Sequence, residues 1–409
     1  MERQLERCAG LDVHRDTVAA CVRVPGRGGH REQHVQTFGT TAAELLRLRE
    51  WLEEQGVTDV AMESTGVYWK PIYYVLEEAF TCLLVNAAHI KQVPGLKTDV
   101  LDCVWIAQLL EHGLLRGSFV PPVPIRELRD LTRYRKGLIQ ERQREANRLH
   151  KVLQDAGIKL ASVATNILGV SGRAMLEALV GGTTAPEVLA ALARGKLRAK
   201  LPALREALAG RFRPHHAFLV SQGLAHLDYL DEAIDTVSTE VERLLLPFVE
   251  PRRRLDTIPG INTRTAEVVI AEIGVDMSRF PSEHHLASWA GLCPGNNESA
   301  GKHKAGTTRK GNRWLRMALI EVALAAIRKK DSAFGARYRR VMRHRGHKKA
   351  VVAVAHSLLR TIYHVLAEST DYREPGADYY DRRQTARTTR RAVAQLERLG
   401  YRVTLESAA

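Results

Sequence analysis

Four carboxylate side chains in the first quarter of the chain stand where apolar segments would otherwise continue. Asp12 interrupts the apolar run GLDVH, and Glu63 follows the apolar run VTDVAM. Asp99 and Asp102 lie three residues apart in KTDVLD, where an apolar helical pattern begins. Residues at i and i+3 share one face of a helix, so these two carboxylates would point the same way. Two like charges so close together repel each other unless a cation lies between them.

Each acid also has an ordinary structural explanation. Asp12 could belong to a turn and Glu63 to the first turn of a helix. Either Thr98 or Asp99 could cap the helix that follows. Taken together, four carboxylates favour a hard divalent cation, because oxygen ligands suit Mg²⁺ and also Mn²⁺. Two such ions about 3.5–4 Å apart can activate one phosphate oxygen and stabilise the oxygen that leaves. The acids therefore predict metal-dependent phosphoryl transfer on nucleic acid.

These acids would be positioned by alternating strand and helix signals in residues 1–120. The order β-β-β-α-β-α-β-α is typical of an α/β ribonuclease-H-like domain, in which an antiparallel meander adds a parallel strand beside its first strand. Asp12 and Glu63 would be neighbours in that sheet, with the helix of Asp99 and Asp102 beside them. An actin-like ATPase begins similarly but needs Gly-rich phosphate loops in a second half, and none follows residue 120. The predicted strands are 8–14, 17–24, 32–40, 57–64 and 81–88, and the predicted helices are 41–55, 69–79 and one that contains KTDVLD.

The composition limits the class of protein. With 409 residues, 45% hydrophobic and 26% charged, the chain is long enough for two or three domains with sizeable cores. The formal net charge is +15, and the segment 302–349 holds sixteen Lys and Arg against two acids, which favours a polyanionic partner. The five cysteines form no C-x-x-C pair, and no segment resembles a signal peptide or a membrane span. We expect a cytoplasmic, nucleoid-associated protein that does not bind membranes.

The sequence after residue 120 predicts mainly helical structure. A Pro-rich linker at 121–124 precedes two long helical patterns, which indicate a helical or coiled-coil insert over 125–250 that serves as a spacer or as a dimerisation arm. The stretch LDTIPGINTRTAEVVIAEIG at 255–274 resembles a helix-hairpin-helix. Backbone N–H groups at its turn, around Gly260, could hold a DNA phosphate.

A possible nucleophile stands in a cationic, glycine-rich loop further along the chain. Ser299 lies near the centre of GLCPGNNESAGKHKAGTTRKGNR. A hydroxyl in such a loop can approach a phosphodiester closely, although an ordinary turn serine would have the same surroundings. The nearby cations that we expect to bind phosphates are Lys302, Lys304, Arg309, Lys310 and Arg313.

The order of these motifs resembles that of the DEDD transposases of IS110-type insertion sequences, including the IS1111 group. The resemblance rests on GLDVH, MESTGVYW, KTDVLD, IPGI and GLCPGNNESAGKHKAGTTRKGNRWLR, and it covers most of residues 8–370. It implies a RuvC-like domain over 1–120 and a transposase domain over 251–370 that carries Ser299 as its nucleophile. The catalytic, metal-binding quartet that it implies is Asp12, Glu63, Asp99 and Asp102.

The resemblance also implies an activity and partners. The expected activity is magnesium-assisted cleavage and rejoining of DNA strands, guided by a noncoding bridge RNA, in a dimer or tetramer whose active sites combine domains of different protomers. Two alternatives stay open: a Holliday-junction resolvase in which metal-activated water replaces the serine, and a catalytically idle nucleic-acid-binding protein. The tail at 371–409 predicts a Tyr- and Arg-rich loop followed by a short helix and a strand.

Overall fold

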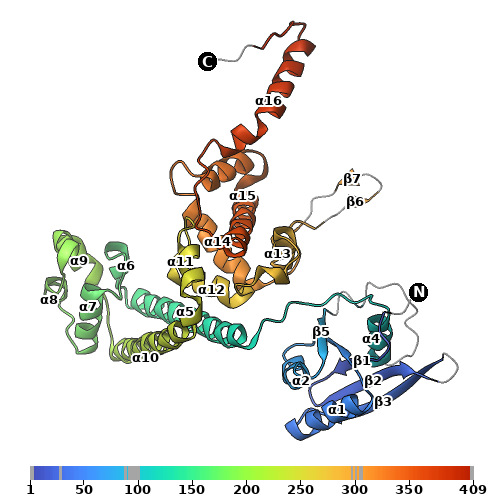
Figure 1. Cartoon of the computed structure of the whole chain (residues 1–409). Coiled ribbons are helices and arrows are strands. Elements are labelled where there is room, and N and C mark those ends of the chain that lie inside the picture. Colours follow the sequence, from blue (N-terminus) through green and yellow to red (C-terminus); the bar gives the residue numbers. More distant parts are fainter. Residues whose placement is uncertain are drawn as a thin grey trace. The chain divides into compact units, whose positions relative to one another are not determined.

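The computed structural model describes residues 4–26, 30–86, 90, 102–295, 298–299, 302–303 and 307–405. The chain divides into two compact units (Figure 1). Met1–Val120 combines strands and helices, whereas Pro121–Ala409 is mainly helical. The finer division of the second unit, at residues 250 and 370, stays a prediction.

A mixed five-stranded sheet in the order β3-β2-β1-β4-β5 forms the first unit. β1 runs antiparallel to β2 and parallel to β4, and β5 is parallel to β4. This RNase H-like strand order confirms the prediction for the N-terminal fold. Its elements are β1 (Cys8–Val13), β2 (Thr17–Pro25), β3 (Arg31–Gly39), α1 (Ala42–Glu54), β4 (Asp59–Glu63), α2 (Trp69–Leu76), β5 (Thr81–Val85) and α4 (Asp102–Glu111).

The two faces of β1 belong to two different layers, because successive side chains of a strand point to opposite faces. Leu11 and Val13 belong to the larger apolar core, which also contains the buried leucines of α1. Cys8 belongs to a second cluster, formed with apolar residues of α4. Gly10 and Asp12 have the same parity as Cys8. Both residues therefore face α4.

Helix α4 lies so close to β1 that position 10 requires glycine. A Cβ atom on Gly10 would lie 2.3 Å from the backbone N of Ala107 and 2.3 Å from the carbonyl O of Cys103. Both of these atoms belong to the helix backbone, so no side-chain rotation could relieve the clash. The absence of a side chain at Gly10 is what allows the helix to rest on the strand.

The far end of α4 is fixed by buried charges. The carboxylate of Glu111, the last residue of α4, is fully buried and forms ion pairs with Arg23 of β2 at 2.6 Å and Arg31 of β3 at 2.8 Å. The backbone O of Glu111 also accepts a hydrogen bond from Gln4 N–H at 2.9 Å. The helix is therefore held along its length, at Gly10 by close packing and at Glu111 by charge.

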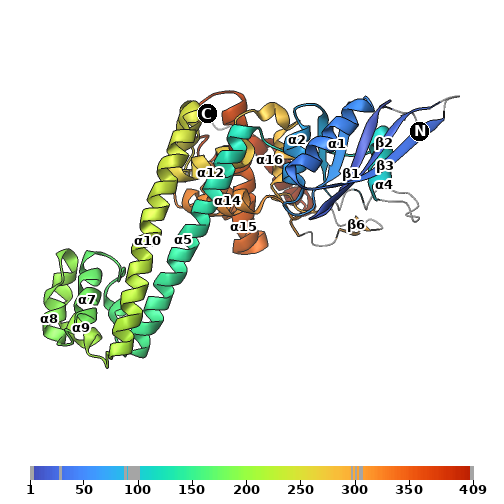
Figure 2. The ribbon, with the colours of Figure 1, turned by 90° about the horizontal axis from the view of Figure 1, so that it is seen from below.

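Two long helices, α5 (Val123–Asp155) and α10 (Pro214–Leu244), pack side by side in the second unit (Figure 2). The predicted linker 121–124 is wrong in its last two residues, which already belong to α5, because proline fits the first turn of a helix. Between α5 and α10 the chain forms a group of short helices that was not predicted. This group shares one apolar core with the adjoining ends of α5 and α10 and consists of α6 (Leu160–Val163), α7 (Val170–Val180), α8 (Pro186–Ala191) and α9 (Leu201–Leu208).

The remaining elements follow α10. The first two helices among them flank the turn at Pro259-Gly260, where the helix-hairpin-helix was predicted. A two-stranded hairpin contains Ser299. The elements are α11 (Val249–Asp256), α12 (Thr263–Ile273), α13 (Glu283–Trp289), β6 (Glu298–Ser299), β7 (Lys302–His303), α14 (Arg313–Ala326) and α15 (Ala333–Ala367).

By length and composition alone, α15 would also be able to cross a membrane. It contains an 18-residue window with a mean hydropathy of 1.5. Half of that window is buried inside the unit, and the core helix of a soluble protein has the same character. The helix is therefore weak evidence for a membrane, and the absence of membrane binding stays a prediction.

The predicted structure of the tail is wrong in part. A loop and then a helix do follow residue 370, but the helix, α16 (Tyr379–Arg398), is 20 residues long and includes the Tyr- and Arg-rich stretch, and 399–405 form no strand. Arginine, alanine, glutamine and leucine have high helix propensity, and they fill much of this segment. Arg382 also forms an ion pair with Asp378 one turn earlier, at 2.8 Å. The helix stops before Gly400, whose φ is +90°.

We expect Gly10→Ala to destabilise the first unit by about 1–3 kcal/mol, because the added methyl group overpacks a backbone contact. Denaturant unfolding of the whole chain, followed by circular dichroism, measures the effect. Gly137→Ala in α5 is the matched control, since a Cβ atom there meets nothing within 4 Å. A Gly10→Ala protein as stable as the wild type would show that the contact does not limit the position of α4.

Candidate active site

Asp12 and Glu63 lie at the same edge of the sheet. Leu11 of β1 pairs with Met62 of β4 in parallel register, so the next residues, Asp12 and Glu63, are neighbours across the two strands. Asp12 faces α4. Glu63 has the parity of Ala61, which belongs to the apolar cluster that includes α4. The two carboxylates therefore lie on the α4 side of the sheet, as the sequence predicted.

Asp102 is the first described residue of α4, the helix that packs on this face of the sheet. The carboxylates near α4 also act on the thiol of the next residue, Cys103. Burial raises the pKa of the Cys103 thiol, and the carboxylates of Asp12 and Asp102 raise it further. The backbone O of Cys103 also packs against Gly10, which lies two residues before Asp12 on the same face of β1, so Asp12 lies on the side of the sheet where the described part of α4 begins. Asp99, the fourth predicted acid, lies outside the described residues.

The chemistry of this acid cluster fits magnesium or manganese. All the candidate ligand atoms are carboxylate oxygens, which these hard ions prefer. Among the described acids, Asp12, Glu63 and Asp102 do not form a group whose oxygens all lie within 4.8 Å of one another. That spread is compatible with Mg²⁺, which keeps several water ligands and needs only one or two carboxylates. The Asp12 side chain is 20% exposed and has Nε2 of His14 3.2 Å from its Oδ2, so its carboxylate is reachable from solvent.

A second group of possible metal ligands, in the helical unit, has hydrogen bonds that argue against a metal. Ligand atoms of Asp155, His215 and His216 lie within 4.8 Å of one another. Nδ1 of the buried His216 accepts a hydrogen bond from Arg213 N–H at 3.1 Å, and its Nε2 lies 2.9 Å from Asp155. A neutral His216 therefore carries its proton on Nε2. A metal on Nε2 would move that proton to Nδ1, where it would oppose the N–H of Arg213.

Ser299 lies in the hairpin β6-β7. It pairs with Lys302 in antiparallel register. The two chain segments at the base of the hairpin approach each other closely, because a Cβ atom on Gly311 would lie 2.4 Å from the backbone N of Gly291. Two glycines are thus needed for the two sides of the loop to come together. Lys304 lies outside the described residues.

Three predicted phosphate-binding cations follow the hairpin. Arg309 and Lys310 are exposed, and Arg313 is the first residue of α14, with its guanidinium 4.9 Å from the centre of the Trp314 ring. No described carboxylate forms an ion pair with any of the three. Their positive charges are therefore available to an external anion, but whether they bind one stays a prediction.

Gly260 has a structural reason to be glycine. Its φ of +88° lies in the left-handed region, and a Cβ atom there would be 2.7 Å from the carbonyl O of Val322 in α14. The turn between α11 and α12 therefore packs closely on α14. The predicted phosphate contact of Gly260 stays a prediction.

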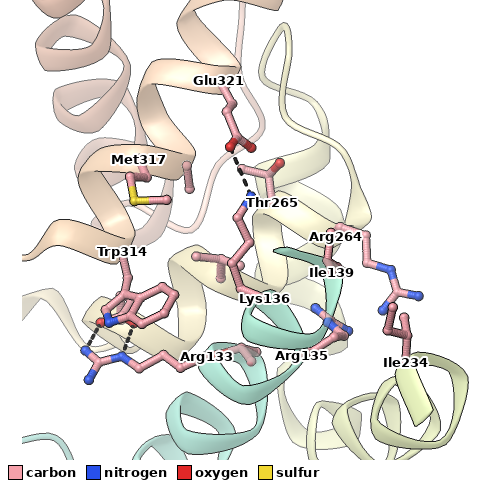
Figure 3. Close-up of a pocket in the computed structure, with 14 residues that line it drawn as sticks. Arg133, Arg135, Lys136, Ile139, Ile234, Arg264, Thr265, Trp314, Met317 and Glu321 are labelled. Carbon is pink, nitrogen blue, oxygen red and sulfur yellow. Dashed lines mark hydrogen bonds and ion pairs between the residues drawn. The ribbon is translucent and has the colours of Figure 1, made fainter. Parts of the chain in front are cut away.

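Glu272 was not singled out from the sequence, yet it fixes the base of the serine hairpin. Its buried carboxylate accepts two hydrogen bonds from Arg133 of α5, both 2.8 Å long, and one from the side chain of Asn312 at 2.6 Å. Asn312 also caps α14 by accepting from the N–H groups of Trp314 and Leu315. Figure 3 shows Arg133 reaching the Trp314 ring, with 5.8 Å between guanidinium carbon and ring centre. Among these contacts, only the helix cap at Asn312 is indicated by the sequence, because an Asn there directly precedes a helical pattern.

A cavity of about 180 Å³ lies beside these contacts, where α5, α10, α12 and α14 meet (Figure 3). Its lining is largely apolar, and it includes Ile139, Ile234 and Met317. The cations in the lining have partners: Arg133 binds Glu272, and Lys136 forms an ion pair with Glu321 at 3.0 Å. We interpret the cavity as a gap between packed helices, because its charges are already neutralised.

Two family models match this chain. A DEDD transposase model of the IS110 type matches residues 9–158, and a model described as the transposase IS116/IS110/IS902 family matches residues 252–339. The first covers the acid cluster and α5. The second covers the turn at Gly260, the serine hairpin and α14.

Curated relatives agree with these models. The transposase for insertion sequence element IS1328 of Yersinia enterocolitica is 24% identical over 347 residues, or 83% of this chain and 93% of that protein. An uncharacterised 43.6 kDa protein of insertion element IS110 in Streptomyces coelicolor is 31% identical over 119 residues, which is 29% of each chain. The pilin gene-inverting protein of Moraxella bovis is 32% identical over 121 residues, 29% of this chain and 37% of that protein. The last two matches thus span well under half of the relatives' lengths.

We expect Asp12→Asn and Asp102→Asn each to weaken Mn²⁺ binding at least about tenfold, because each removes one anionic oxygen ligand. Isothermal titration of the whole chain with Mn²⁺ measures the affinity. Asp16→Asn is the matched control: Asp16 lies in the turn after β1 and its side chain is 84% exposed. Unchanged Mn²⁺ affinity in both cluster variants would rule out this metal site.

Proposed function

This chain belongs to the IS110 family of DEDD transposases, and we propose that it excises and inserts its own insertion sequence by cleaving and rejoining DNA strands. The observation that supports the proposal is that Asp12 and Glu63 are neighbours at one edge of an RNase H-like sheet, on the face where α4, with Asp102 at its described start, packs against β1. The names of the relatives add support. Transposition and gene inversion, named for the Yersinia and Moraxella proteins, both require DNA strands to be cut and rejoined.

In this proposal the acid cluster holds the metal and Ser299 is the nucleophile. Asp12, Glu63, Asp99 and Asp102 bind magnesium, with manganese as a substitute. When bound, the metal supplies charge stabilisation at the scissile phosphate. Ser299 Oγ attacks phosphorus; the Oγ–P bond forms as the P–O bond to one DNA strand breaks, which gives a phosphoserine and a free strand end whose oxygen keeps the electron pair of the broken bond. A carboxylate of the cluster accepts the serine proton, and a second strand end then displaces Ser299.

The serine hairpin and its flanks hold the DNA backbone. Lys302, Lys304 and Arg313 stand beside the nucleophile in the chain, and Arg309 and Lys310 are exposed with no described carboxylate paired to them. Cations of this kind position phosphates without reading sequence. We propose that a noncoding bridge RNA supplies the sequence specificity, as the resemblance of the motifs implies.

The proposed assembly is a dimer or tetramer of this chain in the cytoplasm, associated with the nucleoid. The acids and Ser299 lie in different compact units, so the reaction requires an arrangement in which the two units meet. Packing of the units within one protomer or between protomers would satisfy this requirement. The α5-α10 helices are the candidate dimerisation arm.

We expect Ser299→Ala to abolish strand transfer while leaving Mn²⁺ and RNA binding intact. The substitution removes the nucleophilic hydroxyl but none of the metal ligands. The wild type, trapped on a nicked suicide DNA substrate, should give a covalent protein–DNA adduct that maps to Ser299 by mass spectrometry. Ser288→Ala, an exposed serine of α13 before the hairpin, is the control and should retain both activities. Recombination by Ser299→Ala would exclude the nucleophile, and cleavage without an adduct would favour the resolvase that uses water.

The charges around the hairpin give a separate prediction. If the basic segment 302–349 contacts about six phosphates, the logarithm of DNA affinity should fall with the logarithm of salt concentration at a slope near −5. Replacing Arg309 and Lys310 with Ala should flatten that slope by about one to two. Fluorescence anisotropy with duplex DNA at several KCl concentrations measures it. An unchanged slope would mean that the two cations only solvate the surface.

A further inference from the structure

Helix α15 is two helices joined by a bend at one glycine. Gly346 has φ +74° and ψ +171°, a backbone conformation essentially confined to glycine. A Cβ atom at Gly346 would meet nothing within 4 Å, so the bend is not forced by a tightly packed neighbour at this position. The bend is therefore a property of the backbone, specified by the glycine itself.

Both arms of the bend are anchored in the helical unit. At the start of α15, Ser332 caps the helix by accepting from Gly335 N–H at 3.1 Å, and the buried Phe334 stacks on Tyr372 with 5.9 Å between ring centres. At the other end, Ala350 begins a run of buried residues that continues through Leu358 and beyond. The segment 339–349, here called the α15 elbow, lies between these anchors and is exposed except at Val341.

A hydrogen bond crosses the bend. Nδ1 of His347 lies 2.8 Å from the hydroxyl of Tyr338, and the two rings meet edge to face with 5.8 Å between centres. Tyr338 precedes the elbow, whereas His347 follows Gly346. The pair therefore ties the two arms together and limits the angle between them.

The elbow is strongly cationic. It holds six Lys and Arg and no acid. None of Arg343, Arg345 and Lys348 forms an ion pair with a described carboxylate, whereas arginines elsewhere in the unit, such as Arg253 with Asp371, do so. Like charges four residues apart, such as Arg339 and Arg343, destabilise a helix. A bound polyanion would relieve that repulsion.

We propose that the α15 elbow docks on the phosphate backbone of duplex DNA, outside the serine hairpin; this inference rests on the proposed function. The residue types argue against single-stranded nucleic acid and against a membrane surface. The elbow has no Phe, Trp or Tyr on which single-stranded bases could stack. Its apolar side chains are limited to the adjacent Val341 and Met342, so it lacks the apolar face with which a basic helix enters a membrane surface. The elbow supplies charges on a bend that one hydrogen bond spans, which suits contacts to backbone phosphates.

The first test removes charge. In the full-length protein, Arg343→Ala, Arg345→Ala and Lys348→Ala together should flatten the salt slope of duplex-DNA binding by about three and weaken binding at least about tenfold. The matched control removes three exposed cations of the helical insert, Arg194, Lys196 and Arg198, and should leave duplex-DNA affinity nearly unchanged. Equal DNA affinity of the two triple variants would overturn the proposal. The proposal would also be overturned if the elbow variants lost affinity only for duplex RNA or only for phosphatidylserine vesicles and not for duplex DNA.

The second test keeps every charge and changes the bend. Gly346→Ala favours a straight helix and should weaken duplex-DNA binding several-fold, and Tyr338→Phe should weaken it less. Gly182→Ala is the matched control, because Gly182 also has a positive φ, +93°, and open space at its Cβ position. Gly346→Ala with wild-type DNA affinity would show that the geometry of the elbow is irrelevant and would overturn the proposal. Thermal melting of each variant separates these effects from unfolding.

Binding is measured in EDTA, so that strand cleavage does not contribute. At saturating nicked DNA, the elbow variants should still form the Ser299 adduct. A wild type that binds DNA through the elbow but forms no adduct would refute the proposed serine chemistry and leave the elbow intact. Conversely, a wild-type adduct together with a salt slope unaffected by the elbow variants would refute only the elbow.

Discussion

The contact between α4 and β1 at Gly10 is the constraint on which the acid cluster depends. Asp12 and Glu63 follow from strand register alone, but Asp102 belongs to a helix, and a helix can slide or tilt on a sheet. At Gly10, backbone atoms of α4 lie 2.3 Å from the position that a Cβ atom would occupy. This close contact fixes the distance between α4 and β1. Divalent ions such as Mg²⁺ need ligands at about 2.0–2.1 Å in near-octahedral geometry, so small displacements of that helix matter. The buried Glu111, paired with Arg23 and Arg31, adds a fixed register at the other end.

The helical unit positions its hairpin by buried charge as well as by the close backbone packing of Gly291 and Gly311. Glu272 draws α5 and the N-terminus of α14 toward α12 through Arg133 and Asn312. Removing one partner of such a buried pair typically costs about 3–5 kcal/mol, because the other charge stays buried without compensation. The pair therefore fixes which helices meet at the base of the hairpin. Arg135 with Glu267, both almost fully buried, gives a second such link between α5 and α12.

The sequence predicted what local patterns determine and missed what depends on distant partners. The strand order and the neighbouring positions of Asp12 and Glu63 follow from period-two alternation and from the rule for parallel neighbours, so both were accessible. Glu272 was not, because its partner Arg133 lies 139 residues away. The helices α6 to α9 were missed because their short apolar segments are ambiguous until they share a core with α5 and α10. In the tail, helix propensity outweighed the Tyr- and Arg-rich composition that had suggested a loop.

Charge also shows why net composition does not locate a nucleic-acid surface. Many arginines of the helical unit are structural, as Arg133 and Arg135 are, so a count of cations overstates the free positive charge. Among the described cations with no ion pair are Arg309 and Lys310 near the hairpin and Arg343 and Arg345 in the α15 elbow, but exposed cations of the helical insert such as Arg194 also lack one. The acid cluster and the hairpin have opposite charges and lie in separate units. In the proposed reaction, a phosphodiester would be attracted to both, to the cluster through a divalent cation and to the hairpin directly. In the proposed reaction, substrate binding would therefore contribute free energy to bringing the two units together, since one ligand engages both sites at once.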